Sequence, residues 1–284
     1  MEQLYSQTFK PWNLTFEIFS ARRITEHFHY KIVRCRNCGL IFSREILPDA
    51  LLSRLYSESK VTYGEYVDAI RRDYWMPLRP FAGEINKGAA LEIGCGSGFF
   101  LEKLLEEGFK NVYGCEPSIE AVEKASALTK KNIYPGFFKK GIYQNKSLDF
   151  ICCFQTLDHL SDPVETIKIC RDILKPDGMI YFVVHDVNSF QAKILRDKSP
   201  IIDIEHIYLF NKNTLKKLFE KEKYKVVKIS SLKNNYPLNY WLKMLSLSGF
   251  GNVVKNVIER TRIGSISFPI AAGNIFIIAK REKE

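Results

Sequence analysis

The chain has 284 residues, a formal net charge of +10 and a hydrophobic fraction of 46%, so it is long enough to bury a sizeable core. No apolar run reaches the roughly 18–20 residues of a membrane-spanning helix, and the N-terminus lacks the order of a secretion signal, so we expect a cytoplasmic protein. The lysines are scattered among glutamates, which indicates solvated helix faces more than a polyanion-binding surface. Seven cysteines, mostly in apolar runs, are typical of buried thiols and not of a disulfide framework.

Residues 1–60 contain one short motif with the spacing of a metal site. Cys35 and Cys38 form a Cys-x-x-Cys-Gly turn in VRCRNCGLIF, which is one knuckle of a zinc ribbon. Structural zinc needs four ligands, but no cysteine precedes Cys35; His27 and His29 would be the candidates to complete the set. We favour a degenerate ribbon without metal, held by apolar side chains: Phe16, Ile18, Phe28, Ile32 and Phe42.

From residue 89 onward, apolar strand-like runs alternate with helix-like runs. Ser118 and Asp162 have the character of helix N-caps, and Pro163 fits a first helical turn. Continuous apolar strands between helices predict an α/β fold with a doubly wound parallel sheet. The long stretch 233–273 is interpreted as a helical insertion before the last strand. The expected strands are 89–93, 111–116, 132–135, 147–154, 178–186, 223–232 and 274–282, and the clearest helices are 98–107 and 213–222.

A glycine-rich turn follows the first of these strands, in LEIGCGSGFF. Gly94, Gly96 and Gly98 would let backbone N–H groups meet a ligand without obstruction. Position 99 is Phe, so the Gly-x-Gly-x-x-Gly spacing of dinucleotide-binding folds is not met. Glu116 ends the next strand, where a carboxylate can accept both hydrogen bonds of a ribose diol.

Four segments in register, LEIGCGSGFF, GCEPS, SLDFICCFQTLDHLSDP and ILKPDGMIYFVV, resemble class I S-adenosylmethionine-dependent methyltransferases. The resemblance runs from about residue 88 to 284 and implies a seven-stranded Rossmann-like sheet whose last strand is antiparallel. It implies S-adenosylmethionine as the cofactor, with its methionine part on the glycine loop, its ribose on Glu116 and its adenine near Gly136. The residues that the resemblance places around the cofactor are Glu92, Gly94, Cys95, Gly96, Gly98, Glu116, Pro117, Ser118, Gly136, Phe137 and Gln155.

Methyl transfer from a sulfonium is an in-line displacement, so it needs alignment and a group that removes the acceptor's proton. His159, His185 and His206 lie after or at the ends of expected strands, and imidazole is a natural base. The resemblance implies a structural role for His159 in many such enzymes. His206 lies in a Glu-His-x-x-x-Phe pattern that resembles one in methyltransferases acting on small molecules and sugars. We take His206 and His159 as the catalytic candidates and leave the role of His185 open.

The resemblance also implies lead-in helices before the sheet and a substrate lid in the insertion. Core packing is the alternative role for the aromatic residues there. The domain division is then 1–60 and 61–284. The N-terminal segment is similar to the zinc-binding segment ahead of some sugar and natural-product methyltransferases. The candidate pocket residues are Tyr63, Tyr66, His185, Tyr236, Tyr240 and Trp241.

The sequence therefore predicts methyl transfer to a small molecule, with a sugar or glycan-precursor hydroxyl favoured and a carbon acceptor open. The turn CFQTLD lacks the Asn/Asp-Pro-Pro-Tyr motif that grips exocyclic amines, and no aromatic-studded basic stripe indicates RNA. The alternatives are an inactive, cofactor-binding partner protein and an RNA or protein methyltransferase. A nucleotide-sugar oxidoreductase is disfavoured by the loop spacing. Peripheral membrane contact through the insertion stays open, as does the oligomeric state.

Overall fold

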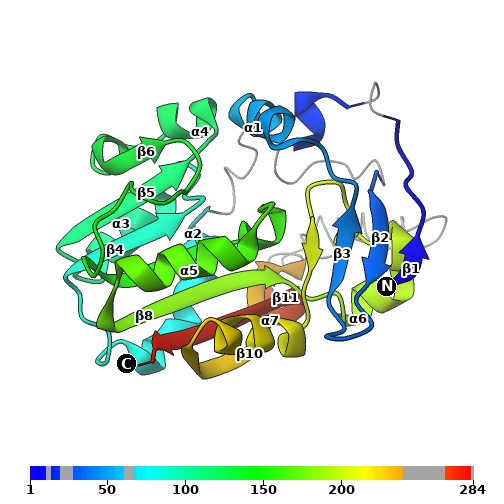
Figure 1. Cartoon of the computed structure of the whole chain (residues 1–284). Helices are drawn as coiled ribbons and strands as arrows, with labels where there is room; N and C mark the ends of the chain where they lie inside the picture. Colours follow the sequence, from blue (N-terminus) through cyan, green and yellow to red (C-terminus); the bar gives the residue numbers. More distant parts are fainter. Residues whose placement is uncertain (11–13, 20–27, 61–66, 239–265, 283–284) are drawn as a thin grey trace.

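The computed structural model describes residues 1–10, 14–19, 28–60, 67–238 and 266–282, and Figure 1 shows a large central sheet beside a smaller one. The strands of the central sheet are β4 (Ala89–Ile93), β5 (Asn111–Glu116), β6 (Ile133–Pro135), β7 (Leu148–Phe154), β8 (Leu174–His185), β10 (Tyr224–Pro237) and β11 (Ser267–Arg281). Their order is β10-β11-β8-β7-β4-β5-β6. β11 is antiparallel to both neighbours and the other pairs are parallel. The predicted seven-stranded sheet with an antiparallel last strand is confirmed.

Helices cover both faces of this sheet. Tyr74 of α2 stacks on Phe154 of β7 with ring centroids 4.3 Å apart, and α3 packs on the same face. On the opposite face, α5 and α7 bury Ile167, Cys170 and Phe219 against the sheet. The helices are α1 (Asp49–Ser57), α2 (Val67–Trp75), α3 (Phe99–Glu106), α4 (Ile119–Glu123), α5 (Pro163–Ile173), α6 (Phe190–Leu195) and α7 (Lys212–Lys221). Short 3₁₀ helices lie at Phe16–Phe19, Met76–Phe81, Lys130–Asn132, Leu157–His159 and Arg196–Lys198.

The helix starts follow the capping chemistry read from the sequence. Ser118 caps α4 by accepting the N–H of Ala121, and Asp162 caps α5 by accepting the N–H of Glu165, with Pro163 in the first turn. Each cap satisfies a backbone donor that the first turn leaves open. The start at Ser118 lies two residues after β5, whereas the start at Asp162 follows β7 after the short 3₁₀ helix Leu157–His159.

The N-terminal residues form a second, antiparallel sheet that includes a strand from far along the chain. Its strands, in the order β1-β2-β3-β9, are β1 (Glu2–Tyr5), β2 (Lys31–Arg34), β3 (Ile41–Arg44) and β9 (Tyr208–Leu209). The N–H of Ser43 also donates to the carbonyl of Ile207 at 2.8 Å. The predicted boundary at residue 60 therefore separates segments that share one sheet.

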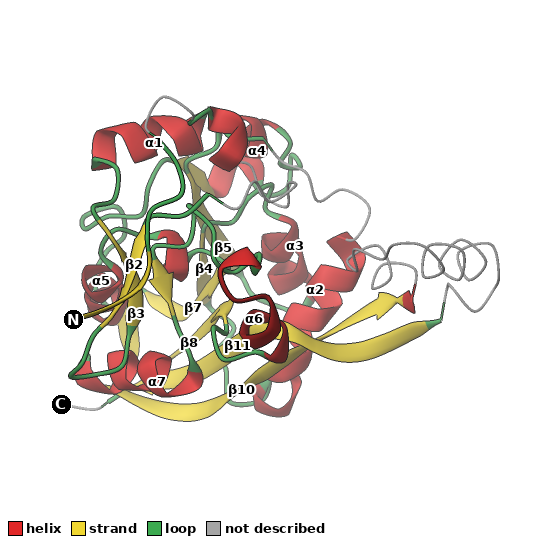
Figure 2. Ribbon diagram, turned by 90° about the vertical axis from the view of Figure 1, so that its right-hand side faces the viewer, coloured by secondary structure: helices red, strands yellow, loops and turns green. Residues whose placement is uncertain are grey.

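The last two strands of the central sheet form a long ribbon that projects from the molecule in Figure 2. Within it, Asn234 pairs with Ile270 and Pro237 with Ser267. The ends of the predicted helical insertion 233–273 are therefore strand and not helix, because they continue the ladder of β10 and β11. The middle of the insertion, 239–265, lies outside the described residues. Within the described parts of the chain, no helix is long and apolar enough to cross a membrane.

Candidate functional site

The glycine loop after β4 follows a left-handed backbone path. Gly94 and Gly98 have φ of 70° and 73°, values that residues with a Cβ rarely adopt. A Cβ on Gly94 would lie 2.3 Å from Thr156 Oγ1, and one on Gly98 would lie 2.9 Å from Thr129 Oγ1. Glycine is therefore required at both positions by conformation and by space. Gly94 and Gly96 keep part of their surface open to solvent.

The carboxylate of Glu116 connects this loop to the turn after β5. Its Oε2 accepts the N–H of Gly96 at 2.9 Å, and its Oε1 accepts the N–H of Ser118 at 2.7 Å. Burial raises the pKa of Glu116, and the two backbone hydrogen bonds oppose that rise. Pro117 lies in the chain between Glu116 and Ser118. The structure thus brings Gly94, Gly96, Glu116 and Ser118 to one edge of the sheet.

Glu92 is a second buried carboxylate, within β4. It is only 2% exposed, and its Oε2 has no hydrogen-bond partner among the described residues. Burial raises the pKa of Glu92 well above its usual range, and the charge of Glu116 raises it further. A positively charged ligand would favour the ionised form of both carboxylates and give the free oxygen a partner. The pair therefore suits a cationic ligand.

Gln155 and Cys95 occupy the same edge in different ways. Gln155 has φ of 50°, and its buried Oε1 lacks a hydrogen-bond partner within the described chain. Such backbone strain, of order 1–3 kcal/mol, is typical of functional turns. The thiol of Cys95 instead points inward, because a Cβ on Gly114 would meet its Sγ at 2.5 Å. Burial raises the pKa of Cys95 well above its usual range, so only its backbone can serve a ligand.

Phe137 and Gly136 follow β6 and lie near the N-terminal helix α1. The N–H of Gly136 donates to the carbonyl of Tyr134 at 3.0 Å. The half-buried ring of Phe137 meets the ring of Tyr56 edge-on, with centroids 6.4 Å apart. Figure 1 shows α1 and α4 side by side above this edge of the sheet. The ring of Phe137 is thus held between the sheet edge and α1.

The three histidines of the sequence analysis meet at one place. The ring of His206 packs edge-on against His185, with centroids 4.3 Å apart, and against His159, at 4.8 Å. His185 Nδ1 lies 2.7 Å from Asp158 Oδ2, and the backbone N–H of His185 donates to the same oxygen at 3.2 Å. The phenolic oxygen of Tyr56 lies 3.2 Å from His159 Nδ1. These five side chains form what we call the histidine cluster.

Burial and charge set the protonation of this cluster. Burial lowers the pKa of His159, and it lowers the pKa of His206 further still, together with the charge of His185. Burial works to raise the pKa of Asp158, but the hydrogen bond with His185 and the charges of the neighbouring histidines together outweigh it and hold the pKa well below its usual range. The cluster therefore contains an ionised carboxylate and two neutral imidazoles near neutral pH.

Two members of the cluster were missed by the sequence analysis. Asp158 lies directly before His159 and just after a predicted strand, a position that could have marked it. Tyr56 offered no such signal, because it reaches His159 across 103 positions of sequence. The hydroxyl of Ser118 also donates to the carbonyl of Ser59 at 2.8 Å. The N-terminal segment is therefore part of the site.

Among the remaining pocket candidates, Tyr236 lies in the described part of the chain and is not in this cluster. Tyr236 is 4% exposed and lies in the core between the sheet and α2, with Phe154 and Tyr181. Four candidate pocket residues and one candidate zinc ligand lie outside the described residues: Tyr63, Tyr66, Tyr240, Trp241 and His27.

The predicted zinc knuckle is a tight turn between β2 and β3. The N–H of Gly39 donates to the carbonyl of Cys35 at 3.0 Å, and hydrogen bonds from Cys38 and Asn37 lower the pKa of the Cys35 thiol. His29 is buried, and its Nδ1 lies 2.8 Å from the carbonyl of Tyr30. Among the described residues, no group of three metal-binding side chains includes either cysteine. The degenerate ribbon without metal that we expect from the sequence stays a prediction.

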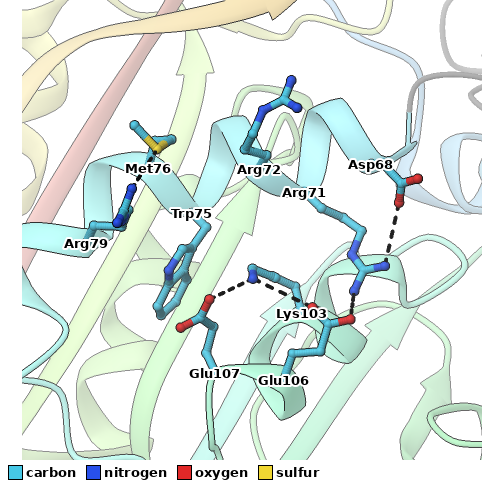
Figure 3. Close-up of a pocket in the computed structure, with 9 residues that line it drawn as sticks. All are labelled: Asp68, Arg71, Arg72, Trp75, Met76, Arg79, Lys103, Glu106 and Glu107. Carbon is cyan, nitrogen blue, oxygen red and sulfur yellow. Dashed lines mark hydrogen bonds and ion pairs between the residues drawn. The ribbon is translucent and has the colours of Figure 1, made fainter.

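A groove of about 620 Å³ on the outer face of α2 and α3 is a different kind of surface (Figure 3). Arg71 pairs with Asp68 and Glu106, and Lys103 lies 2.6 Å from Glu107. Its basic side chains are thus largely neutralised by acidic neighbours. The groove lies toward the C-terminal end of α3, whereas the glycine loop lies at its N-terminal end. It is therefore not the cofactor site.

Comparison with known proteins identifies the family of this chain. A family model described as a methyltransferase domain matches residues 67–229, more than half of the chain. The chain belongs to the class I S-adenosylmethionine-dependent methyltransferases. This membership makes S-adenosylmethionine the cofactor. The two buried carboxylates at the glycine loop fit that ligand, since it carries positive charge on its sulfonium and amino groups.

Individual relatives of this methyltransferase have different substrates. This chain is 29% identical over 165 residues to a tRNA U34 carboxymethyltransferase of Campylobacter fetus, and the match covers 55% of this chain and 57% of the relative. It is 30% identical over 126 residues to a ubiquinone biosynthesis O-methyltransferase of Actinobacillus pleuropneumoniae, covering 41% and 52%. The chain therefore spans less than two thirds of either relative.

Solved structures agree on the fold. A putative methyltransferase of Haloferax volcanii, solved in complex with the Trm112 methyltransferase activator, superposes with a TM-score of 0.54 and 17% identity, covering 77% of this chain and 93% of the other. At that identity the likeness establishes the fold alone.

Proposed function

We propose that this methyltransferase transfers a methyl group to an oxygen atom of a small molecule bound against the histidine cluster. S-adenosylmethionine supplies the activated methyl group. The glycine-loop backbone and Glu92 would hold its methionine part, and Glu116 its ribose. The full set proposed for the cofactor is Glu92, Gly94, Cys95, Gly96, Gly98, Glu116, Pro117, Ser118, Gly136, Phe137 and Gln155.

The observation that carries this proposal is the cover that α1 places over the histidine cluster. Tyr56 contacts both His159 and Phe137, and the residues after α1 are fastened to the turn after β5 through Ser118. A site enclosed from this side suits a small acceptor more than a folded macromolecule. Asp158 and His159 of the cluster are also close in sequence to Thr156, whose side chain lies against Gly94 of the glycine loop.

The chemistry requires the acceptor to be aligned and its proton removed. His185 is suited to the second task. With its Nδ1–H donating to Asp158 at 2.7 Å, its Nε2 keeps a lone pair for the proton of the acceptor hydroxyl. Its side chain is 24% exposed, so it can reach a bound molecule. His159 and His206 line the same place and remain catalytic candidates through contact with the acceptor.

The choice of acceptor draws on one relative and on the N-terminal segment. The relative named as a ubiquinone biosynthesis O-methyltransferase favours an oxygen acceptor on a small molecule. The N-terminal segment favours a sugar or glycan precursor as the acceptor molecule. Transfer to a carbon atom of such a molecule is the alternative to transfer to its hydroxyl oxygen. Neither choice follows from the geometry of the cluster.

RNA is the second candidate substrate. Two observations favour it: the net charge of +10 and the relative named as a tRNA U34 carboxymethyltransferase. The cover of α1 weighs against it, because an unstacked base would have to enter beneath Tyr56. An inactive cofactor-binding partner is disfavoured by the intact glycine loop and by Glu116.

The test combines binding and transfer. Calorimetric titration with S-adenosylhomocysteine measures the cofactor site first. The protein is then incubated with radiolabelled S-adenosylmethionine and three acceptor pools: sugar nucleotides, phenolic small molecules and bulk tRNA. We expect label in a small-molecule pool only, and a Glu116→Ala variant should lose it. Transfer of label to tRNA alone would replace the proposal with the RNA alternative. If the protein does not bind S-adenosylhomocysteine, both proposals are wrong.

A further inference from the structure

Three side chains of the histidine cluster converge as ligands of a metal ion do. Asp158, His159 and His206 each offer one ligand atom, and these atoms lie within 4.8 Å of one another. Asp158 and His159 come from the turn after β7, and His206 from the residues before β9. Asp158 is 1% exposed and His206 is 7% exposed. The group is therefore shielded from bulk water.

Each of the three also carries a buried polar atom without a hydrogen-bond partner in the described structure. These atoms are Asp158 Oδ1, His159 Nε2 and His206 Nδ1. Buried polar atoms are normally paired, and leaving one unpaired costs free energy. Asp158 Oδ1 and His159 Nε2 lie 3.9 Å apart, too far for a hydrogen bond between them. A single occupant between the three side chains would satisfy all three.

The other polar atoms of these side chains are already held. Asp158 Oδ2 receives the N–H groups of His185. His159 Nδ1 lies at the hydroxyl of Tyr56, so its Nδ1–H can donate there and leave a lone pair on Nε2. The ring of His206 has a backbone hydrogen bond with Ile201. Outer partners of this kind orient histidine and carboxylate ligands toward a metal.

We infer that Asp158, His159 and His206 bind a divalent first-row transition-metal ion. Two imidazole nitrogens and one carboxylate oxygen form a donor set that suits zinc, iron or cobalt. Bonds of about 2.0–2.2 Å in a tetrahedron separate donor atoms by roughly 3.4 Å. The 3.9 Å pair is near that value, and the widest separation of 4.8 Å has to shorten by about 1.4 Å through side-chain shifts.

Three protein ligands leave a fourth position open. If the proposed function holds, that position faces the acceptor, and a metal there would lower the pKa of the acceptor hydroxyl before His185 removes its proton. This use of the ion rests on the proposed function. The binding of the ion does not, so the two can fail separately.

The experiment is a titration of the chelator-treated 284-residue protein with CoCl₂, monitored by the visible absorption spectrum of the cobalt. A Cys35→Ser/Cys38→Ser variant removes the other candidate zinc site and is the background for all measurements. We expect one equivalent of Co²⁺ with the spectrum of nitrogen and oxygen ligation. In the same background, His159→Gln/His206→Gln should weaken cobalt binding by about 100-fold or more while S-adenosylhomocysteine still binds.

A second measurement covers the case in which that variant does not fold. X-ray absorption of the cobalt-loaded cysteine variant, with native histidines, should show two imidazoles per ion. The inference is overturned if that variant binds no stoichiometric cobalt although S-adenosylhomocysteine binds normally. It is equally overturned if the histidine substitutions leave binding unchanged or the absorption spectrum shows no imidazole.

Discussion

Replacing Glu116, whose carboxylate connects the glycine loop to the turn after β5, tests whether this side chain holds the cofactor. In the ligand-free protein it accepts two backbone N–H groups, at 2.9 and 2.7 Å. Hydrogen bonds to a charged group contribute about 1.5–3 kcal/mol each. Glu116→Ala loses the carboxylate that would hold the ribose. We therefore expect its affinity for S-adenosylhomocysteine to fall by about 1.5–3 kcal/mol, or roughly 10- to 150-fold.

The stability of the ligand-free variant should change much less. Glu116→Ala also removes a carboxylate whose pKa burial has raised, so the lost hydrogen bonds and the relieved desolvation oppose each other. The raised pKa further predicts that wild-type affinity increases with pH as Glu116 ionises, and that Glu116→Gln lacks this dependence. Calorimetric titration at several pH values measures both effects.

Glu123→Ala is the matched control, because it removes the same charge from the exposed end of nearby α4. Its affinity should equal that of the wild type. If Glu116→Ala and Glu116→Gln both bind S-adenosylhomocysteine within about threefold of the control, the proposed role of Glu116 is wrong.

Three further changes test other parts of the site. Gly94→Ala places a Cβ 2.3 Å from Thr156 Oγ1 at positive φ, so it should lower the stability by about 1–3 kcal/mol and abolish cofactor binding. Gly83→Ala is the control, because open space surrounds Gly83, and it should change neither quantity. Thermal melts and calorimetric titrations measure both. Glu92→Gln should stabilise the ligand-free protein by an amount that grows as pH rises from about 4.5, because a raised pKa means that the native state binds the proton more tightly than the unfolded chain; a pH-independent difference in urea unfolding contradicts this. Tyr56→Phe leaves His159 Nδ1 without its partner and should cost about 1 kcal/mol in urea unfolding, and an unchanged midpoint would show that the hydroxyl contributes nothing.

The central sheet was predictable because most of its strands are marked by a short apolar run in the sequence. The runs 89–93 and 111–116 are mostly apolar, and the caps at Ser118 and Asp162 lie where the helices begin. The cofactor loop was predictable for the same reason, since its glycines and Glu116 follow two of these strands directly. Contacts within such short stretches are encoded by neighbouring residues.

The rest of the site depends on contacts between distant parts of the chain. Tyr56 reaches His159, and Ser43 pairs with Ile207, through packing that no local pattern encodes. The long ladder of β10 and β11 was likewise cut short in the sequence, because KNNYP (233–237) has the composition of a turn. There the register of the partner strand overrides local preference.

The pairing of β3 with β9 has a consequence for folding during synthesis. The first three strands of the small sheet are complete once residue 44 has left the ribosome, but their fourth strand, residues 208–209, is made much later. At about 5–20 residues per second, the nascent segment waits roughly ten seconds or longer for that partner. Ile207, which bonds to Ser43 of β3 and to Asp158, directly follows His206 in the chain, so we expect β9 to pair as His206 reaches Asp158. A ribosome-bound chain that ends before β9 should therefore have its glycine loop formed and its histidine cluster still apart.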